Sequence, residues 1–262
     1  MLWRFVSDRE PSNFYHARSF GGTMLGLIAD IHGNAWALDA VIADARRRGV
    51  SAFVNLGDAL YGPLAPRRTF DLLQQMNIVA EVSGNQDRLI LEGTGNPTLD
   101  WVRDDLGAEP LKWLRNLPKT ASFDDRLLCH GTPSSDTTYL LEDVRHGFAR
   151  IRSDADILSL LENVQSHWIF CGHSHLQHLV TLSSGQTIVN PGSLGLPAYD
   201  DEKPVRHAME TFSPHARYAI VESAEVSFHA VKYDWNSAAR RATELGREDW
   251  AWSIVSGRGA PG

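Results

Sequence analysis

From residue 24 onward, short apolar runs alternate with stretches whose apolar residues recur at helical spacing. Runs of strand type occupy residues 24–29, 52–57 and 77–84, and the stretches between them have helical character. The first of these helices is the best defined, because Asn34 can cap it and Gly49 can end it. Such alternation is typical of an α/β protein. The pattern therefore predicts that the chain begins as a βαβαβ unit.

The second half of the chain is richer in strand-like segments. Runs at residues 127–131 and 168–172 flank a stretch, residues 138–151, that we interpret as helical. After residue 175, short strand-like segments dominate. A parallel first part followed by a strand-rich second part predicts an α/β fold, a four-layer α/β/β/α sandwich of two mixed sheets with helices outside. Residues 236–262 include an amphipathic helical pattern, which we interpret as a packing element.

Bulk composition narrows the class of protein. With 262 residues, 43% of them hydrophobic, we expect a single domain over residues 24–262. Residues 1–23 lack the apolar segment of a secretory signal, so we expect a disordered extension, and the working chain could begin at Met24. The net charge of −7 argues against broad nucleic-acid or anionic-lipid binding. No apolar run approaches the roughly 18 residues of a membrane helix. Two cysteines, Cys129 and Cys171, are too few for a disulfide framework, and a cytoplasmic location is expected.

Side chains of metal-binding type stand where the strand-like runs end. One or two of them follow each of five runs: Asp30 with His32, Asp58, Asn85, His130, and His173 with His175. Because ligands of open α/β sheets bind beyond the carboxyl ends of the strands, we expect these residues to converge in space. A lone Asp-x-His pair would indicate no more than a surface turn. The complete set predicts a metal site.

These motifs, in this order, resemble those of the calcineurin-like metallophosphoesterase family, over residues 24 to about 235. The similarity extends to the family's small bacterial and archaeal phosphodiesterase branch through Asn190-Pro191-Gly192-Ser193. The resemblance implies two divalent metal ions, one held by Asp30, His32 and His175, the other by Asn85, His130 and His173, with Asp58 bridging them. Carboxylate, amide and imidazole donors suit manganese, iron, zinc or nickel.

The resemblance also implies a reaction. Two such ions would activate a bridging hydroxide that attacks a phosphoester, with Asp58, Asn85 and His130 acting through the metals. Asp87 would support this loop. Where the protein-phosphatase branch has a histidine after the motif asparagine, this chain has Gln86, whose amide cannot protonate a leaving group. We therefore expect small phosphodiester substrates with acidic leaving groups, such as aryl or nucleotide esters.

Several further residues are weaker candidates. Asn34 and Arg88 could contact a substrate phosphate, although helix capping and solvation are their ordinary roles. Asn190 is expected to orient His173 or His175. His178 could replace the missing acid.

Two tryptophans have two possible roles. Trp101 and Trp113 could stack a base, although core packing is more usual for such residues.

The sequence also leaves alternative functions open. A phosphomonoesterase or protein phosphatase is a second function, against which Gln86 counts. A non-catalytic metal-binding scaffold is a third, against which the full set of ligands counts. The sequence leaves the physiological substrate, the native metal and the oligomeric state open.

Overall fold

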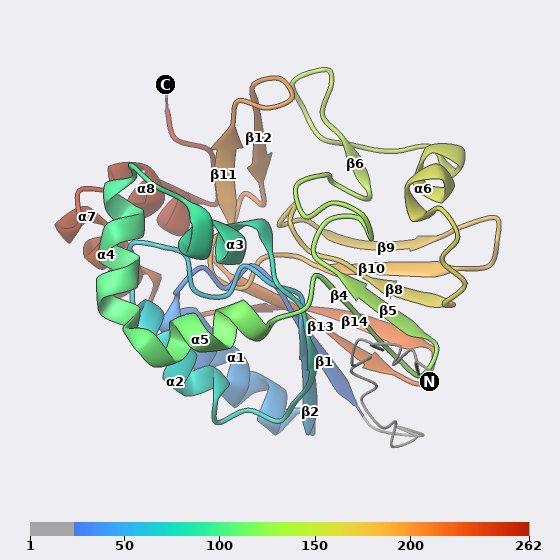
Figure 1. The fold of residues 1–262 in the computed structure, drawn as a ribbon, viewed down its shortest axis with the longest axis horizontal. Helices are drawn as coiled ribbons and strands as arrows, with labels where there is room; N and C mark the ends of the chain where they lie inside the picture. Colours follow the sequence, from blue (N-terminus) through green and yellow to red (C-terminus); the bar gives the residue numbers. More distant parts are fainter. Residues whose placement is uncertain (1–23, 262) are drawn as a thin grey trace, which may run out of the picture.

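The computed structural model describes residues 24–261, so the extension expected at residues 1–23 lies outside the described residues. The fold is built on two five-stranded sheets (Figure 1). The first sheet has the order β14-β13-β1-β2-β3, with β1 (Leu25–Ile28), β2 (Ala52–Asn55), β3 (Ile78–Glu81), β13 (Ala216–Glu222) and β14 (Glu225–Val231). The second has the order β4-β5-β8-β10-β9, with β4 (Thr120–Phe123), β5 (Arg126–Cys129), β8 (Trp168–Phe170), β9 (Gln177–Thr181) and β10 (Thr187–Pro191).

Both sheets are mixed. In the first, β1, β2 and β3 are parallel neighbours, while β13 and β14 are antiparallel. In the second, β5, β8 and β10 are parallel neighbours between the antiparallel strands β4 and β9. Two short hairpins lie outside these sheets, formed by β6 (Glu142–Asp143) with β7 (Arg150–Ile151) and by β11 (Ala198–Asp201) with β12 (His207–Glu210).

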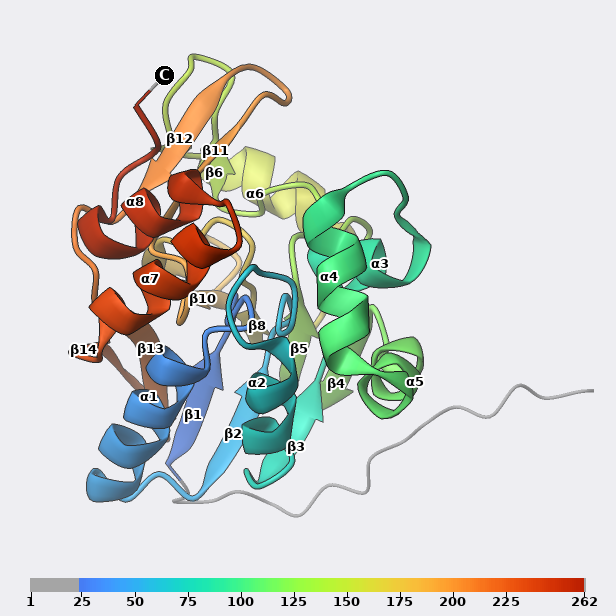
Figure 2. The ribbon, with the colours of Figure 1, turned by 90° about the vertical axis from the view of Figure 1, so that its left-hand side faces the viewer.

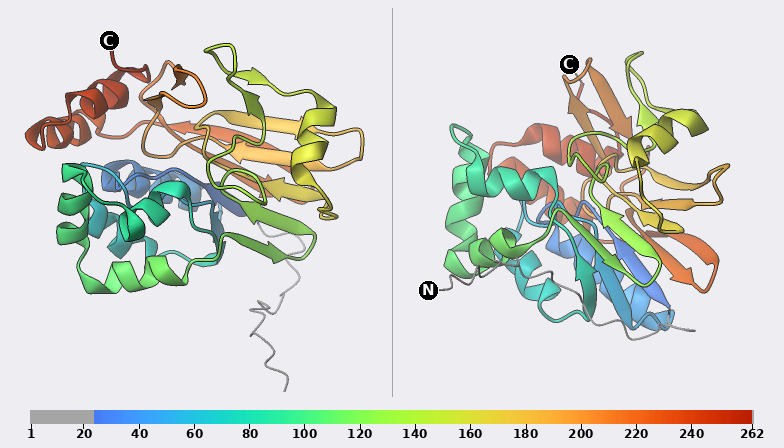
Figure 3. Two further views of the ribbon diagram at one scale, coloured as in Figure 1. Left: turned by 45° about the horizontal axis from the view of Figure 1, so that its top comes forward. Right: turned by 45° about the vertical axis from the view of Figure 1, so that its right-hand side comes forward.

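The helices cover the outer faces of the sheets. They are α1 (Ala35–Arg47), α2 (Pro66–Leu73), α3 (Asn85–Glu92), α4 (Pro97–Leu106), α5 (Ala108–Asn116), α6 (Asp154–Leu161), α7 (Trp235–Glu244) and α8 (Glu248–Ser256). Figure 3 shows α6, in yellow, on the opposite side of the two sheets from α1 and α2. In Figure 2, α7 and α8 lie beyond the tips of β1 and β2, the end of the sheet to which these strands point. The predicted four-layer arrangement is confirmed.

Alternation along the strands explains the layers. In β8, Phe170 is fully buried in a cluster that contains Leu27 and Val54 of the first sheet. Its neighbour Ile169 belongs to a separate cluster that contains Ile157 of α6. Because successive strand side chains point to opposite faces, the second sheet is buried on both sides. This requires the near-continuous apolar runs seen in the sequence.

One secondary-structure prediction is wrong. Residues 138–151 contain no helix; the structure has strands β6 and β7 there, joined through Gly147 with a φ of +82°. Tyr139 stacks on His173, whereas Leu141 is buried against α6 and the second sheet. These contacts lie in different parts of the protein, so tertiary packing overrides the helical periodicity. None of the helices in residues 24–261 combines the length and apolar character that a membrane span requires.

Candidate metal centre

The loops after five strands bring the predicted ligands together. Asp30 and His32 follow β1, Asp58 follows β2, and Asn85 begins α3 directly after the loop from β3. The second sheet contributes His130 after β5 and the pair His173 and His175 after β8. Because β1, β2 and β3 are parallel neighbours, and β5 and β8 are too, these loops all lie at the carboxyl ends of the strands. Neighbouring strands thus bring together ligands that are far apart in the sequence.

The backbone at this centre is strained. Nine non-glycine residues among residues 24–261 have positive φ, and five of them are candidate ligands: Asp30, His32, Asp58, His173 and His175, with φ between 52° and 70°. The left-handed conformation costs roughly 1–2 kcal/mol for such a residue. Backbone hydrogen bonds hold it in place, including those from Asp30 to Gly57 and from His32 to Asp58, each 3.0 Å long. Backbone strain concentrated at one group of neighbouring residues is typical of a functional site.

A close approach of two loops requires a glycine. A Cβ atom at Gly84 would collide with the Asp58 carboxylate and its backbone nitrogen. The absence of a side chain at Gly84 therefore lets the loop after β3 pack directly on the loop after β2. This places Asn85 within reach of His130.

Backbone carbonyls fix the orientation of the imidazoles. Nδ1 of His32 donates to the Tyr61 carbonyl at 3.0 Å, Nδ1 of His130 to the Leu56 carbonyl at 2.7 Å, and Nδ1 of His175 to the Leu196 carbonyl at 2.6 Å. A carbonyl oxygen only accepts, so each Nδ1 carries its proton. The Nε2 atoms of these residues are directed into the centre, where a neutral imidazole offers a lone pair to a metal ion.

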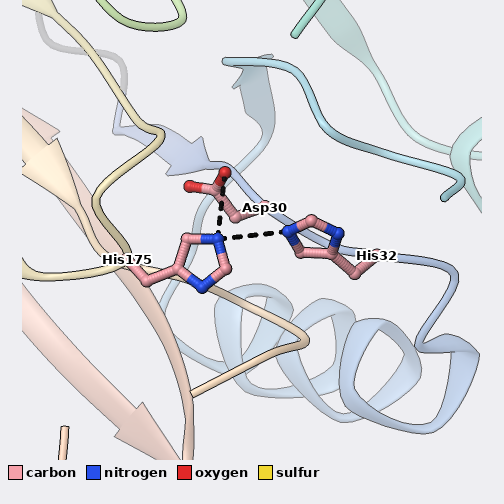
Figure 4. A group of neighbouring side chains, drawn as sticks. All are labelled: Asp30, His32 and His175. Atoms are coloured by element: carbon pink, nitrogen blue, oxygen red, sulfur yellow. Dashed lines mark hydrogen bonds and ion pairs between the residues drawn. The ribbon is translucent and has the colours of Figure 1, made fainter. Parts of the chain in front are cut away.

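The first group of ligand atoms comprises Asp30, His32 and His175 (Figure 4). The Nε2 atoms of His32 and His175 are 3.1 Å apart, and Nε2 of His175 is 3.5 Å from Oδ1 of Asp30. The three ligand atoms lie within 4.8 Å of one another. With their protons on Nδ1, the two imidazoles have no proton at Nε2 to donate across this gap. A cation between the two Nε2 lone pairs would satisfy both.

The second group comprises Asp30, Asp58 and His130. Nε2 of His130 is 3.3 Å from Oδ2 of Asp58, 3.8 Å from Oδ1 of Asp30 and 3.1 Å from Oδ1 of Asn85. His173 is also present, with its ring centroid 5.1 Å from that of His130. The backbone N–H of Gln86 donates to Oδ1 of Asp58 at 2.7 Å, which leaves Oδ2 facing the centre.

The donor set fits divalent ions. Oδ1 of Asp30, fully buried, has no hydrogen-bond partner among the described residues, and such an isolated carboxylate oxygen is costly without a cation. Asp30 is common to both groups, whereas the family resemblance assigns the bridging role to Asp58. The oxygen and nitrogen donors of the predicted ligands suit borderline divalent metals.

The pKa values follow from burial and from neighbouring charges. Burial lowers the pKa of His32 to about 4, with His175 adding to the effect, and burial and His130 do the same to His173. Burial also disfavours charge on Asp58, but the charge and hydrogen bond of His130 outweigh it and hold the pKa of Asp58 well below its ordinary value. For His130, burial is outweighed by Asp58, and the pKa rises to about 10.

Asp87 lies beneath the centre rather than in it. Its carboxylate accepts backbone hydrogen bonds from Asp58 at 2.8 Å, Gly84 at 3.0 Å and Ala59 at 3.1 Å, and it is fully buried. It therefore ties the loop after β2 to the start of α3. Burial, and next the charge of Asp58, raise the pKa of Asp87 to about 7.

A cavity of about 350 Å³ opens from the candidate ligands. Gln86 lines it, and the Oε1 atom of this residue is buried without a partner among the described residues. Sequence reasoning missed three of the other wall residues, Arg247, Asp249 and Trp250, since they belong to no motif and lie in the stretch interpreted as a packing element.

Tyr199 contacts both histidines of the loop after β8. The Tyr199 hydroxyl donates to the His173 carbonyl at 3.0 Å, and the Tyr199 ring packs edge-on against His175 with centroids 4.5 Å apart. Tyr139, whose hydroxyl is 2.8 Å from that of Tyr199, stacks on His173. Hairpin β11–β12 is thereby joined to the metal centre.

The candidates for substrate contact lie outside this cavity. Asn34 caps α1 through Ala37 and donates to the Gly195 carbonyl at 2.8 Å and to the Tyr233 hydroxyl at 3.2 Å, so its polar atoms are occupied. Arg88 forms two hydrogen bonds with Asp136, of 2.8 and 3.0 Å, in a neighbouring cavity that His130 also lines.

Four other candidates have structural contacts. Asn190 donates to the Gly172 carbonyl at 2.9 Å and to the Ser174 hydroxyl at 3.0 Å, so it contacts the loop that carries the histidines and not an imidazole. His178 pairs with buried Glu142 at 3.3 Å. Neither tryptophan reaches the cavity: Trp113 bonds to Glu81 and packs on Phe70, while Arg241 lies over Trp101.

Comparison with known proteins agrees with this geometry. Residues 24–212 match the model of the calcineurin-like phosphoesterase superfamily domain. An uncharacterized protein of Methanocaldococcus jannaschii is 26% identical over 263 aligned residues, which cover 87% of this chain and 95% of the relative. The crystal structure of a metallophosphoesterase from Sphaerobacter thermophilus is 25% identical and covers 90% of this chain and 100% of that chain, with a TM-score of 0.71.

Proposed function

Because the chain belongs to the calcineurin-like phosphoesterase superfamily, whose members hydrolyse phosphoesters, we propose that it hydrolyses phosphodiesters with the help of two divalent metal ions. The observation that carries this proposal is the convergence of seven residues with oxygen and nitrogen donors, five of them on strained backbone. One of these donor atoms, Oδ1 of Asp30, has no hydrogen-bond partner among residues 24–261.

The family resemblance assigns the residues that would hold the ions, and the two groups of neighbouring ligand atoms support most of this assignment. Asp30, His32 and His175 would hold one, and Asn85, His130 and His173 the other, with Asp58 shared between them. When bound, such ions act as Lewis acids on the phosphoryl group and lower the pKa of a bound water to near neutrality. Manganese, iron, zinc and nickel all suit this donor set.

The chain's own groups prepare this site. The carbonyls of Tyr61, Leu56 and Leu196 hold three imidazoles in the tautomer that presents Nε2. The backbone N–H of Gln86 holds one oxygen of Asp58, so the other faces the centre. Asp87 ties the two loops together. Positioning of this kind lowers the reorganisation that the reaction needs.

The surroundings favour diesters over monoesters. Gln86 lines the cavity and has no proton to give to an alkoxide, while both Asp87 oxygens accept backbone hydrogen bonds. Acid assistance to the leaving group is therefore missing from this loop. Two carboxylates on the cavity wall, Asp200 and Asp201, also disfavour the dianion of a monoester relative to the single charge of a diester.

Metal-stripped protein refilled with manganese tests the proposal, with bis-p-nitrophenyl phosphate and p-nitrophenyl phosphate as substrates. Asp58→Asn and His130→Ala are each expected to lose at least 100-fold in diester turnover. This loss of diester turnover should be accompanied by a reduced metal content, measured on the same samples. Faster monoester than diester turnover would instead assign a phosphomonoesterase. No turnover at full metal occupancy would contradict both.

We also propose that the protein acts in the cytoplasm. Cys129 and Cys171 are buried free thiols, and burial raises the pKa of both. Such thiols are compatible with a reducing cytoplasm.

A further inference from the structure

The last helix, α8, forms part of the cavity that opens from the metal centre. Arg247, Asp249, Trp250 and Ser253 line it together with the candidate ligands, and all four lie in or next to α8. The match to the phosphoesterase domain ends at residue 212. This wall of the cavity is therefore contributed by a segment outside the region that matches the family model.

Trp250 is held directly beside a candidate ligand. Only 8% of the residue is exposed, and its indole ring meets the His32 ring edge-on at 5.7 Å between centroids. The Tyr61 ring lies 6.2 Å away. A Cβ atom at Gly62 would approach the indole to 2.9 Å, so the loop after Asp58 packs tightly on this ring. The position of the indole is consequently fixed relative to the metal centre.

Arg247 gives this wall a planar surface without a free charge. Its guanidinium lies over the Trp250 ring, 5.5 Å from the centroid. Two hydrogen bonds of 2.9 and 2.6 Å join it to Asp249, and a third of 2.8 Å joins it to the Thr98 hydroxyl. With its charge paired, the guanidinium offers a planar face for stacking rather than an anion site.

The cavity wall also carries hydrogen-bond acceptors. Asp200 and Asp201 of β11 line it. Asp200 accepts from the backbone of Ala260 at 2.7 Å, which also holds the C-terminal tail at the cavity. Carboxylates accept hydrogen bonds from hydroxyl and amino groups and repel a second phosphate.

We propose that the wall formed by Arg247 and Trp250 is the subsite for the second ester group of the substrate, and that it takes a planar, uncharged, nucleoside-like group. This inference rests on the proposed phosphodiesterase function and deepens it. A planar group stacks on the exposed part of the paired guanidinium, which the buried indole supports from behind, and its hydroxyl or amino donors meet the acceptors of β11. Nucleobase stacking on such side chains contributes roughly 5- to 150-fold per base.

Three p-nitrophenyl diesters with one leaving group separate the alternatives. They are thymidine 5′-(p-nitrophenyl phosphate), methyl p-nitrophenyl phosphate and p-nitrophenyl phosphorylcholine, each assayed with the manganese-loaded full chain. We expect kcat/KM for the thymidine ester to exceed that for the methyl ester by about tenfold or more. A preference for the choline ester over the thymidine ester would overturn the inference, because the wall would then select a cation.

Variants on one helix provide the matched comparison. Trp250→Leu should reduce the thymidine-to-methyl ratio at least fivefold, and Arg247→Gln should do so if Trp250→Leu fails to fold. Trp252→Leu is the control, because Trp252 is 42% exposed, bonds to Gly259 and does not line the cavity. An equal loss on both esters in the Trp250 and Arg247 variants, or no change in the ratio, would overturn the inference.

A binding measurement keeps this inference separate from the proposed function. Calorimetric titration of the manganese-loaded protein with thymidine 5′-phosphate and with methyl phosphate gives the same ratio without turnover. Tighter binding of the thymidine compound that is lost in Trp250→Leu supports the subsite even if no diester is hydrolysed. Hydrolysis of the methyl ester with no thymidine preference in either measurement refutes the subsite alone.

Discussion

Metal binding is predicted to release a proton from His130 at pH 7.5. In the metal-free protein, both ring nitrogens of His130 face oxygen acceptors: the Leu56 carbonyl at 2.7 Å, and Asp58 and Asn85 at 3.3 and 3.1 Å. Such surroundings favour the doubly protonated ring. Burial opposes this charge, but Asp58 outweighs burial and raises the pKa of His130 to about 10. A metal ligand must be neutral, so the ion has to displace this proton.

The size of the effect follows from the pKa. A value of about 10 lies about 2.5 units above pH 7.5, which corresponds to about 3 kcal/mol of lost binding free energy, or roughly 300-fold in affinity. The proton is bound below pH 10 and lost above it, so affinity should rise about tenfold per pH unit between pH 7 and 9. His32 and His173, with pKa values of about 4, are neutral throughout this range and release none.

Calorimetric titration of manganese in buffers of different ionisation enthalpy counts the protons released, and at least one is expected. Histidine NMR of the metal-free protein assigns it, because His130 should be charged at pH 7.5 and become neutral on metal binding. In Asp58→Asn the main charge beside His130 is gone, so the ring should titrate at lower pH. A neutral His130 in the metal-free protein, or an affinity independent of pH, would refute the reasoning.

Three further predictions concern the loops and ligands around the centre. Asp87→Asn should lower the free energy of unfolding by about 1–3 kcal/mol, because an amide nitrogen would face backbone donors. Denaturant titration measures this change. Unchanged stability would contradict the role of Asp87 in tying the loop after β2 to α3. Gln86→His should raise turnover of alkyl diesters more than that of aryl diesters, and a change of only a few-fold in their ratio would weaken the account of leaving-group protonation. In the metal-free Asp87→Asn variant, which lacks the opposing proton uptake of Asp87 with its raised pKa of about 7, stability should fall as pH falls from about 6.5 to about 4 in thermal melts. The reason is that the unfolded chain protonates His32 and His173 in this range and the folded chain does not. A flat profile in this variant would contradict the burial of neutral rings.

Local sequence was sufficient for the features that repeat. The apolar runs that became β1, β2 and β3 predicted parallel strands, and Asn34 caps α1 as its position indicated. The ligands could be chosen because each follows a strand, so strand adjacency alone brings them together. The four-layer fold follows from the same runs, which need burial on both faces.

Features that depend on distant contacts could not be predicted in this way. Residues 138–151 have a helical pattern, yet Tyr139 is drawn to His173 and Glu142 to the Ser174 hydroxyl. Trp250 lies 218 positions after His32 in the sequence and shares no motif with it, although the two rings touch. Strand adjacency does not determine where C-terminal helices pack. The substrate wall therefore became visible only in the structure.

The most direct test of the two-metal centre is anomalous diffraction from crystals soaked in manganese. Two peaks are predicted, roughly 3.5–4 Å apart, one against His32 and His175 and the other against His130 and His173. Asp30 and Asp58 should contact them. A single peak, or manganese bound away from these residues, would contradict the account.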